Sequence, residues 1–226
     1  MTKIPKDQFD FLSYAAHQMQ HPLGILRGYL DLFFKNPNES DKKVIEDELV
    51  RLSYLISQIL KLSKVETESL KINFEKVEII SFLRNFFEKF SQIISTHNFV
   101  FNEPKEKNLV VSIDRNEMGE ALQTLLENAI KYTPQNGTIK LSISSTTKNV
   151  IISILDNGPG IPKKIQKKIF DPFYRGSTNK PGSGLGLSIA KKTIELHGGK
   201  ISVKSEEKKF TEFKFTIPRV LPKKKV

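Results

Sequence analysis

Asparagine, lysine, aspartate and glycine residues recur at short spacing in the second half of the sequence. Asn128 lies near the C-terminal end of a predicted helix, and an amide oxygen is a hard ligand suited to Mg²⁺. Lys131, three residues later, shares that face of the helix and could contact phosphate. Asp156 follows a predicted strand and opens the glycine-rich turn DNGPGIP (156–162), where its carboxylate can accept a hydrogen bond from an exocyclic amine. These residue types suit the metal ion, the phosphates and the base of a nucleotide.

Two further clusters follow along the chain. The segment IFDPFYRG (169–176) contains aromatic residues that can anchor a loop and one arginine, Arg175, that is available for phosphate. The segment GSGLGLS (182–188) opens a predicted helix, so its backbone N–H groups can face an anion. It lacks the Lys-Ser/Thr ending of a P-loop and does not follow the first strand of a dinucleotide fold. Only the four clusters together, in this order, predict a nucleotide site.

The four clusters resemble the nucleotide motifs of one family. NAIKYTP (128–134), DNGPGIP, IFDPFYRG and GSGLGLSIA (182–190) are similar to the N box, first glycine box, F box and second glycine box of sensor histidine kinases. Upstream, FLSYAAHQMQHPL (11–23) resembles the phosphoacceptor H box of that family. The resemblance implies a dimerisation and histidine-phosphotransfer hairpin, followed by an α/β-sandwich ATP-binding domain of the type shared with HSP90, gyrase and MutL ATPases.

The resemblance also implies which molecules bind and which residues hold them. ATP and Mg²⁺ are the expected cofactors, and Asn128 resembles the Mg²⁺-binding asparagine. Lys131 resembles the phosphate-contacting base, and Tyr132 resembles the ring that lies against adenine. Asp156 resembles the acceptor of the adenine amino group.

Further contacts are expected from the two glycine boxes and the loop between them. Arg175 is similar in position to an arginine near the γ-phosphate, which makes it a candidate catalytic residue. The segment between residues 171 and 182 corresponds to a short ATP lid. The remaining expected contacts to the nucleotide are Gly158, Gly160, Ile161, Gly184, Leu185 and Gly186.

The H box pattern places the acceptor histidine five residues before a proline, and His17 stands five residues before Pro22. An imidazole is mostly neutral near neutral pH, so one ring nitrogen can attack the γ-phosphorus while the other carries the proton. In-line transfer then requires mainly positioning and charge neutralisation. The resemblance implies that the phosphoryl group passes on to an aspartate of a response-regulator receiver domain. His21, one helical turn later, is the lesser acceptor candidate.

Three residues depart from the family pattern. Gln18 stands where an acidic residue usually follows the acceptor, and its amide can orient the imidazole but cannot take up a proton. Because loss of a general base costs at most roughly 10²–10⁴-fold, we expect a slowed kinase. His21 replaces the Thr or Asn tied to phosphatase activity, and Thr124 replaces an asparagine one turn before Asn128. These departures leave an alternative open, a nucleotide-binding dimeric scaffold with little or no phosphotransfer.

The first sixty or so residues must position the acceptor. A polar break at residues 35–40 separates two stretches whose apolar residues alternate steps of three and four, as on one helix seam. The first seam is Leu12, Ala15, Met19, Pro22, Leu26, Tyr29 and Phe33, and the second is Val44, Ile45, Leu49, Leu52, Ile56 and Ile59. Two such helices make an antiparallel hairpin with little core of its own. We therefore expect a homodimer that pairs two hairpins into a four-helix bundle.

From about Leu70 the pattern becomes mixed. Helices are expected at 79–94, 115–132 and 186–197, and strands at 99–102, 109–113, 138–144, 150–155, 201–204 and 213–217. This order favours a sheet with helices on one face. The predicted fold is α+β, with a phosphotransfer hairpin at 1–66, an ATP-binding domain at 67–220 and a basic tail at 221–226. His197, at the end of the last helix, is interpreted as a structural cation facing the helix dipole.

The amino-acid composition restricts the classes of protein, metal site and binding partner that remain possible. The 226 residues include no cysteine, which excludes disulfide scaffolds and thiolate metal sites. The net charge of +11 raises nucleic acid as a partner, but only six of the 36 basic residues are arginine, so we expect a solvated lysine-rich surface and no nucleic acid. We also expect no membrane span, a cytoplasmic location, and an upstream sensor module outside this chain.

Overall fold

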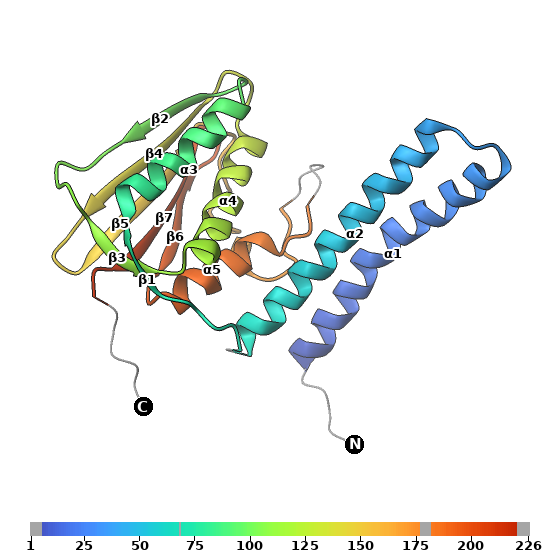
Figure 1. Ribbon diagram of the computed structural model, residues 1–226, viewed down its shortest axis with the longest axis horizontal. Coiled ribbons are helices and arrows are strands. Elements are labelled where there is room, and N and C mark those ends of the chain that lie inside the picture. The colour runs from blue at the N-terminus through green and yellow to red at the C-terminus, as the bar shows by residue number, and fades with distance from the viewer. Residues whose placement is uncertain (1–5, 68, 177–181, 221–226) are drawn as a thin grey trace.

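The computed structural model describes residues 6–67, 69–176 and 182–220, with side chains from residue 13 onward. The predicted basic tail and residues 177–181 of the predicted lid lie outside the described residues. The chain begins with two antiparallel helices, α1 (Lys6–Lys35) and α2 (Glu39–Glu66), which form the predicted hairpin (Figure 1). Asn38 begins α2 because its Oδ1 accepts a hydrogen bond from the backbone N–H of Asp41 at 2.8 Å.

The rest of the chain is a sheet covered by helices on one face (Figure 1). Five strands pair in the order β2-β4-β5-β7-β6, antiparallel except for the parallel pair β2 and β4. These strands are β2 (Asn98–Asn102), β4 (Thr138–Ser145), β5 (Asn149–Asp156), β6 (Ile201–Glu206) and β7 (Phe210–Pro218). The helices are α3 (Ile79–Ile93), α4 (Arg115–Tyr132) and α5 (Gly186–Leu196), with the short 3₁₀ helix η1 (Lys168–Phe170). This confirms the predicted order of a helical hairpin followed by a sheet with helices on one face.

Burial alternates along β4 and β5, so one face of the sheet is covered. In β5 the side chains of Val150, Ile152 and Ile154 are fully buried, while the residues between them lie on the other face. The buried side packs against Leu122 and Leu125 of α4, whose side chains are at most 1% exposed. One continuous core therefore fixes the height and orientation of α4 against the end of β5.

Two short elements were missed by the sequence analysis. β1 (Glu75–Glu78) pairs antiparallel with β3 (Val110–Ile113) in a separate two-stranded sheet. Its sequence, EKVE, buries only Val77, so no alternating apolar pattern marks it. The other missed element is η1, whose three residues are too few to carry a helical period.

His197 ends α5 as expected, but its interpretation as a cation was wrong. The ring is fully buried, Nδ1 lies 2.7 Å from the carbonyl oxygen of Thr193, and Nε2 lies 3.0 Å from the backbone nitrogen of Asp114. Nε2 must accept this hydrogen bond, so the ring is neutral with its proton on Nδ1. Burial lowers the pKa of His197. The ring fastens the end of α5 to the start of α4.

The hairpin leaves much of its apolar surface uncovered. On α2 the side chains of Leu55 and Leu62 are buried, although Leu55 lies outside the predicted seam. Ile56 and Leu60 are 41% and 57% exposed, and Leu23 of α1 is 50% exposed. Helix α2 therefore has two apolar sides, one that is covered within the chain and one that is exposed. None of the helices among the described residues has the length and apolar character of a membrane span.

Candidate functional site

The last turns of α4 present the predicted metal and phosphate contacts. The side-chain nitrogen of Asn128 donates a hydrogen bond to the carbonyl oxygen of Thr124 at 2.9 Å. Because the two amide atoms lie on opposite sides of Cγ, Asn128 Oδ1 points away from that carbonyl and is the atom available to an ion. Lys131 Nζ lies 5.1 Å from the centre of the Tyr132 ring. It also lies close to Gly182, where an added Cβ would come within 3.0 Å of it.

The first glycine box follows β5 directly and places Asp156 at the end of that strand. The Asp156 side chain is buried, and one carboxylate oxygen accepts a hydrogen bond from the N–H of Gly158 at 2.9 Å. Burial raises the pKa of Asp156 to about 6. Gly160 has φ +69°, and a Cβ there would lie 2.1 Å from the carbonyl oxygen of Glu206, so only glycine fits this turn. The turn thus holds a buried carboxyl group at the edge of the site, and this group is mostly ionised at pH 7.

The second glycine box begins α5 beside α4. A Cβ on Gly186 would lie 2.9 Å from the Thr124 methyl group, so the helices meet closely at this point. Thr124, which departs from the family pattern, is therefore packed against the glycine box by its methyl group. Leu185 begins α5 with a fully buried side chain, and its N–H donates to Ser183 Oγ at 3.3 Å. Arg175 is exposed near the end of the F-box loop.

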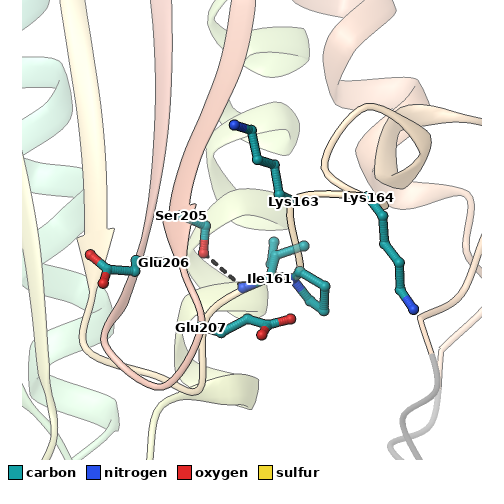
Figure 2. Close-up of a pocket in the computed structure, with 7 residues that line it drawn as sticks. Ile161, Lys163, Lys164, Ser205, Glu206 and Glu207 are labelled. Carbon is teal, nitrogen blue, oxygen red and sulfur yellow. Dashed lines mark hydrogen bonds between the residues drawn. The ribbon is translucent and has the colours of Figure 1, made fainter.

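A hollow borders the first glycine box on the side of the β6–β7 hairpin (Figure 2). The N–H of Ile161 donates to Ser205 Oγ at 2.7 Å and fixes one wall. Lys163 and Lys164 line the hollow together with the carboxylates of Glu206 and Glu207; Pro162 completes the lining. Of the predicted nucleotide contacts only Ile161 belongs to it. The hollow is therefore distinct from the cluster formed by Asn128, Lys131 and Asp156.

The domain formed by the sheet and its helices packs on the hairpin. Lys61 of α2 forms an ion pair with Glu117 of α4 at 2.8 Å and a second, shorter one with Glu120. Leu62 of α2 is buried in the same small apolar cluster as Ile189 of α5. The predicted acceptor lies on the neighbouring helix, where His17 is exposed and Gln18 is half-buried.

The two glycine boxes both lie against the C-terminal half of α4, because a Cβ on Gly158 would lie 3.1 Å from the Tyr132 carbonyl oxygen and one on Gly186 would lie 2.9 Å from the Thr124 methyl group. The structure thus brings these motifs together on α4 and sets this domain against the hairpin that bears His17.

Comparisons with known proteins agree with this architecture. Residues 7–68 match the model of the His Kinase A (phospho-acceptor) domain, and residues 113–221 match that of the histidine kinase-, DNA gyrase B- and HSP90-like ATPases. The catalytic domain of the histidine kinase ThkA is 34% identical over 65% of this chain and 98% of its own, with a TM-score of 0.59. The chain belongs to the sensor histidine kinases of two-component systems.

Relatives of this histidine kinase extend beyond the compared region. The sensor histidine kinase WalK of Bacillus subtilis is 32% identical over 96% of this chain but only 37% of its own length. The Acinetobacter baumannii histidine kinase AdeS, 24% identical, shares the fold with a TM-score of 0.75 over 90% of this chain and 98% of its own. The chain thus spans less than half the length of the curated relatives that it matches first.

Some residues of this kinase were not anticipated as part of the site. Tyr14 stacks on Phe173, with ring centroids 5.0 Å apart, and Lys61 joins the two halves through its ion pairs. Tyr14 lies three residues before His17, which is the one signal that could have drawn attention to it. Phe173 belongs to the F box, where it was interpreted only as an anchor for its own loop. Nothing in the sequence marks Lys61 among the many lysines.

Proposed function

We propose that this chain is an ATP-dependent protein-histidine kinase that phosphorylates its own His17. The observation that carries the proposal is that the turn after Asp156 lies against the end of the helix that bears Asn128 and Lys131, since a Cβ on Gly158 would lie 3.1 Å from the Tyr132 carbonyl oxygen. This domain packs on the hairpin that bears His17. Asp156 would accept a hydrogen bond from the adenine amino group, and the Tyr132 side chain would lie against the adenine ring. Lys131 and Arg175 would neutralise phosphate charge.

The donor set also suits Mg²⁺. Asn128 Oδ1 is a hard oxygen ligand, and its orientation is fixed by the hydrogen bond to Thr124. Mg²⁺ prefers to keep waters and phosphate oxygens in its shell, so a single protein ligand is sufficient alongside a bound triphosphate. When bound, the ion would lower the negative charge around the γ-phosphorus.

We propose that the phosphoryl group then passes to an aspartate of a response-regulator receiver domain. ThkA, solved in complex with the response regulator protein TrrA, is 28% identical over 95% of this chain and 63% of its own, with a TM-score of 0.77. The open apolar side of the hairpin supports a homodimer, because burial of such side chains favours association. An ATP-dependent kinase of this kind acts in the cytoplasm, under the control of a sensor module elsewhere in the protein.

Incubation with γ-labelled ATP and Mg²⁺ tests the proposal. We expect acid-labile, alkali-stable label on the protein that is lost in His17→Ala and retained in His21→Ala, which is the matched control on the next turn of α1. Loss of the label only in His21→Ala would identify His21 as the phosphoacceptor in place of His17. ATP binding without any label would favour the scaffold, which the replacement of an acidic residue by Gln18 makes the second candidate. Steady phosphate release without protein label would indicate an ATPase.

A further inference from the structure

The F-box loop of this chain touches the acceptor helix of the same chain close to His17. The rings of Tyr14 on α1 and Phe173 have centroids 5.0 Å apart and planes inclined at 35°. Tyr14 precedes His17 by three residues, and residues three apart are neighbours on adjacent turns of a helix. The loop is therefore seated on the surface of α1 from which His17 projects.

Phe173 also belongs to a small buried apolar cluster between the two halves of the chain, and Tyr14, which is 45% exposed, lies beside that cluster. Ala15 of α1 and Leu62 of α2 are 4% and 0% exposed, and they pack with Phe173 and Leu185, which are 6% and 0% exposed. Ile189 of α5 completes the buried set. Phe173 and Leu185 thus pack on the hairpin in the same cluster.

The backbone of the loop is shaped for this contact. Phe173 has φ +61°, a left-handed conformation that is rare for a bulky residue and persists only where its surroundings hold it. Gly184, with φ +74°, lies so close that a Cβ there would come within 2.7 Å of the Phe173 carbonyl carbon. The glycine box thus supports the Phe173 backbone from behind, and the ring faces α1.

Two exposed leucines of α1, Leu23 and Leu30, lie on the opposite side from Tyr14, whereas Leu32, which is 53% exposed, projects on the same side as Tyr14. At about 100° per residue, Leu23 and Leu30 project roughly 180° and 160° away from Tyr14. They are 50% and 37% exposed, and they mark the side on which the proposed partner hairpin would pack. By the same arithmetic His17 projects about 60° from Tyr14 but about 120° and 140° from Leu23 and Leu30, so it lies nearer to the contact with the chain's own F-box loop than to that open side.

We propose that phosphoryl transfer in this dimer occurs within each chain, from ATP bound at Asn128 and Asp156 to the His17 of the same chain, with Tyr14 as a positioning residue. This inference rests on the proposed kinase function. A ring nitrogen of His17 would form the new N–P bond with its lone pair while the bond from the γ-phosphorus to the bridging oxygen breaks. ADP leaves, and the proton on the other ring nitrogen passes to water.

Two heterodimers with opposite expectations test the direction of transfer. The first pairs His17→Ala with Asp156→Asn, so that one chain lacks the acceptor and the other lacks the nucleotide contact. The second pairs the unaltered chain with the double variant. Chains carrying different tags allow each heterodimer to be purified, and binding of a fluorescent ATP analogue checks that Asp156→Asn no longer binds nucleotide.

Transfer within a chain predicts no label in the first heterodimer and label in the second. Label in the first heterodimer and none in the second would overturn the proposal and show transfer across the dimer. Label in both would also overturn it, because exclusive transfer within a chain leaves no route to label in the first. The unaltered homodimer is the control for the proposed kinase function. If the chain is not a kinase, that homodimer takes up no label, whereas transfer across the dimer still labels it.

Single variants test the role of Tyr14. We expect Tyr14→Ala to lower the labelling rate at saturating ATP at least tenfold while the affinity for the ATP analogue stays within twofold, and Tyr14→Phe to restore the rate. A purely structural role would leave the rate unchanged in a folded protein or lower ATP affinity in parallel. Circular dichroism of both variants checks that the helices are intact. Equal rates for Tyr14→Ala and the unaltered chain would remove Tyr14 from the proposal.

Discussion

The two halves of the molecule bury their apolar side chains to different degrees. The ATP-binding half closes one core between sheet and helices, in which side chains such as Leu83, Leu125 and Ile152 are at most 1% exposed. The hairpin has only a thin buried strip, and Leu23 and Ile56 remain 50% and 41% exposed. The catalytic half can therefore fold by itself, whereas the hairpin depends on what packs against it.

The largest effect is expected inside the closed core. Leu83→Ala in α3 should lower the free energy of unfolding of the catalytic half by about 2–5 kcal/mol, because the surrounding side chains cannot fill the cavity. The matched change Leu60→Ala, at a position 57% exposed on α2, should leave that free energy within about 0.5 kcal/mol. Chemical denaturation followed by tyrosine fluorescence checks both. Similar losses for the two variants would contradict the contrast between the halves.

The next effect concerns the open side of the hairpin. Ile56→Glu places a charge on that side and should weaken the dimer by about 2 kcal/mol, or roughly thirtyfold in Kd, because the carboxylate must be desolvated on association. Ser57→Glu adds the same charge one residue further round the helix and serves as the control. Sedimentation equilibrium gives both dissociation constants. Equal weakening by the two variants would show that this side is not the interface.

The sequence predicted the elements whose pattern is regular and missed those that depend on packing. The strand at 138–144 was found because its alternate residues are apolar, and the strand at 150–155 was found because it is an almost unbroken run of apolar residues, whereas β1 buries only Val77. The polar residues of the nucleotide motifs stand at the ends of predicted elements, so their convergence followed from the order of strands and helices. The contact of Tyr14 with Phe173 joins residues 159 positions apart, and no local period encodes it.

The third effect is a pH dependence of ATP affinity, which follows from the buried carboxyl group of Asp156 in the ATP-binding half. Asp156 has a pKa of about 6 because it is buried, and the proposed hydrogen bond from adenine requires its ionised form. The ionised fraction falls from about nine-tenths at pH 7 to about one-tenth at pH 5, so ATP affinity should fall about tenfold over this range. Titration with a fluorescent ATP analogue measures this change. The Asp156→Asn variant should bind the ATP analogue weakly at both pH values. If its affinity still fell tenfold between pH 7 and pH 5, Asp156 would be excluded as the cause of the pH dependence.

The smallest effect is the pH dependence of folding, where two buried groups of the catalytic half act in opposite directions. The lowered pKa of His197 means that the unfolded chain takes up its proton first, below the ordinary value of 6.5, so acidification destabilises the fold. The raised pKa of Asp156 means that the folded chain takes up a proton first, near pH 6, so the same acidification stabilises it. Each contribution is at most about 1.4 kcal/mol per pH unit, and the two partly cancel between pH 6.5 and 5.

Removing one of the two groups separates their contributions. In Asp156→Asn the free energy of unfolding should decrease more steeply from pH 6.5 to 5 than in the unaltered chain, because only the His197 contribution remains. In His197→Gln the slope should reverse or flatten, since only Asp156 then favours the acidic side. Urea denaturation at half-unit pH steps resolves these slopes. His17→Ala, at an exposed position on the hairpin, is the control for replacing a histidine outside the catalytic half. A change of slope in that variant as large as the one in His197→Gln would contradict the assignment to His197, because, of these two histidines, only His197 is buried in the catalytic half.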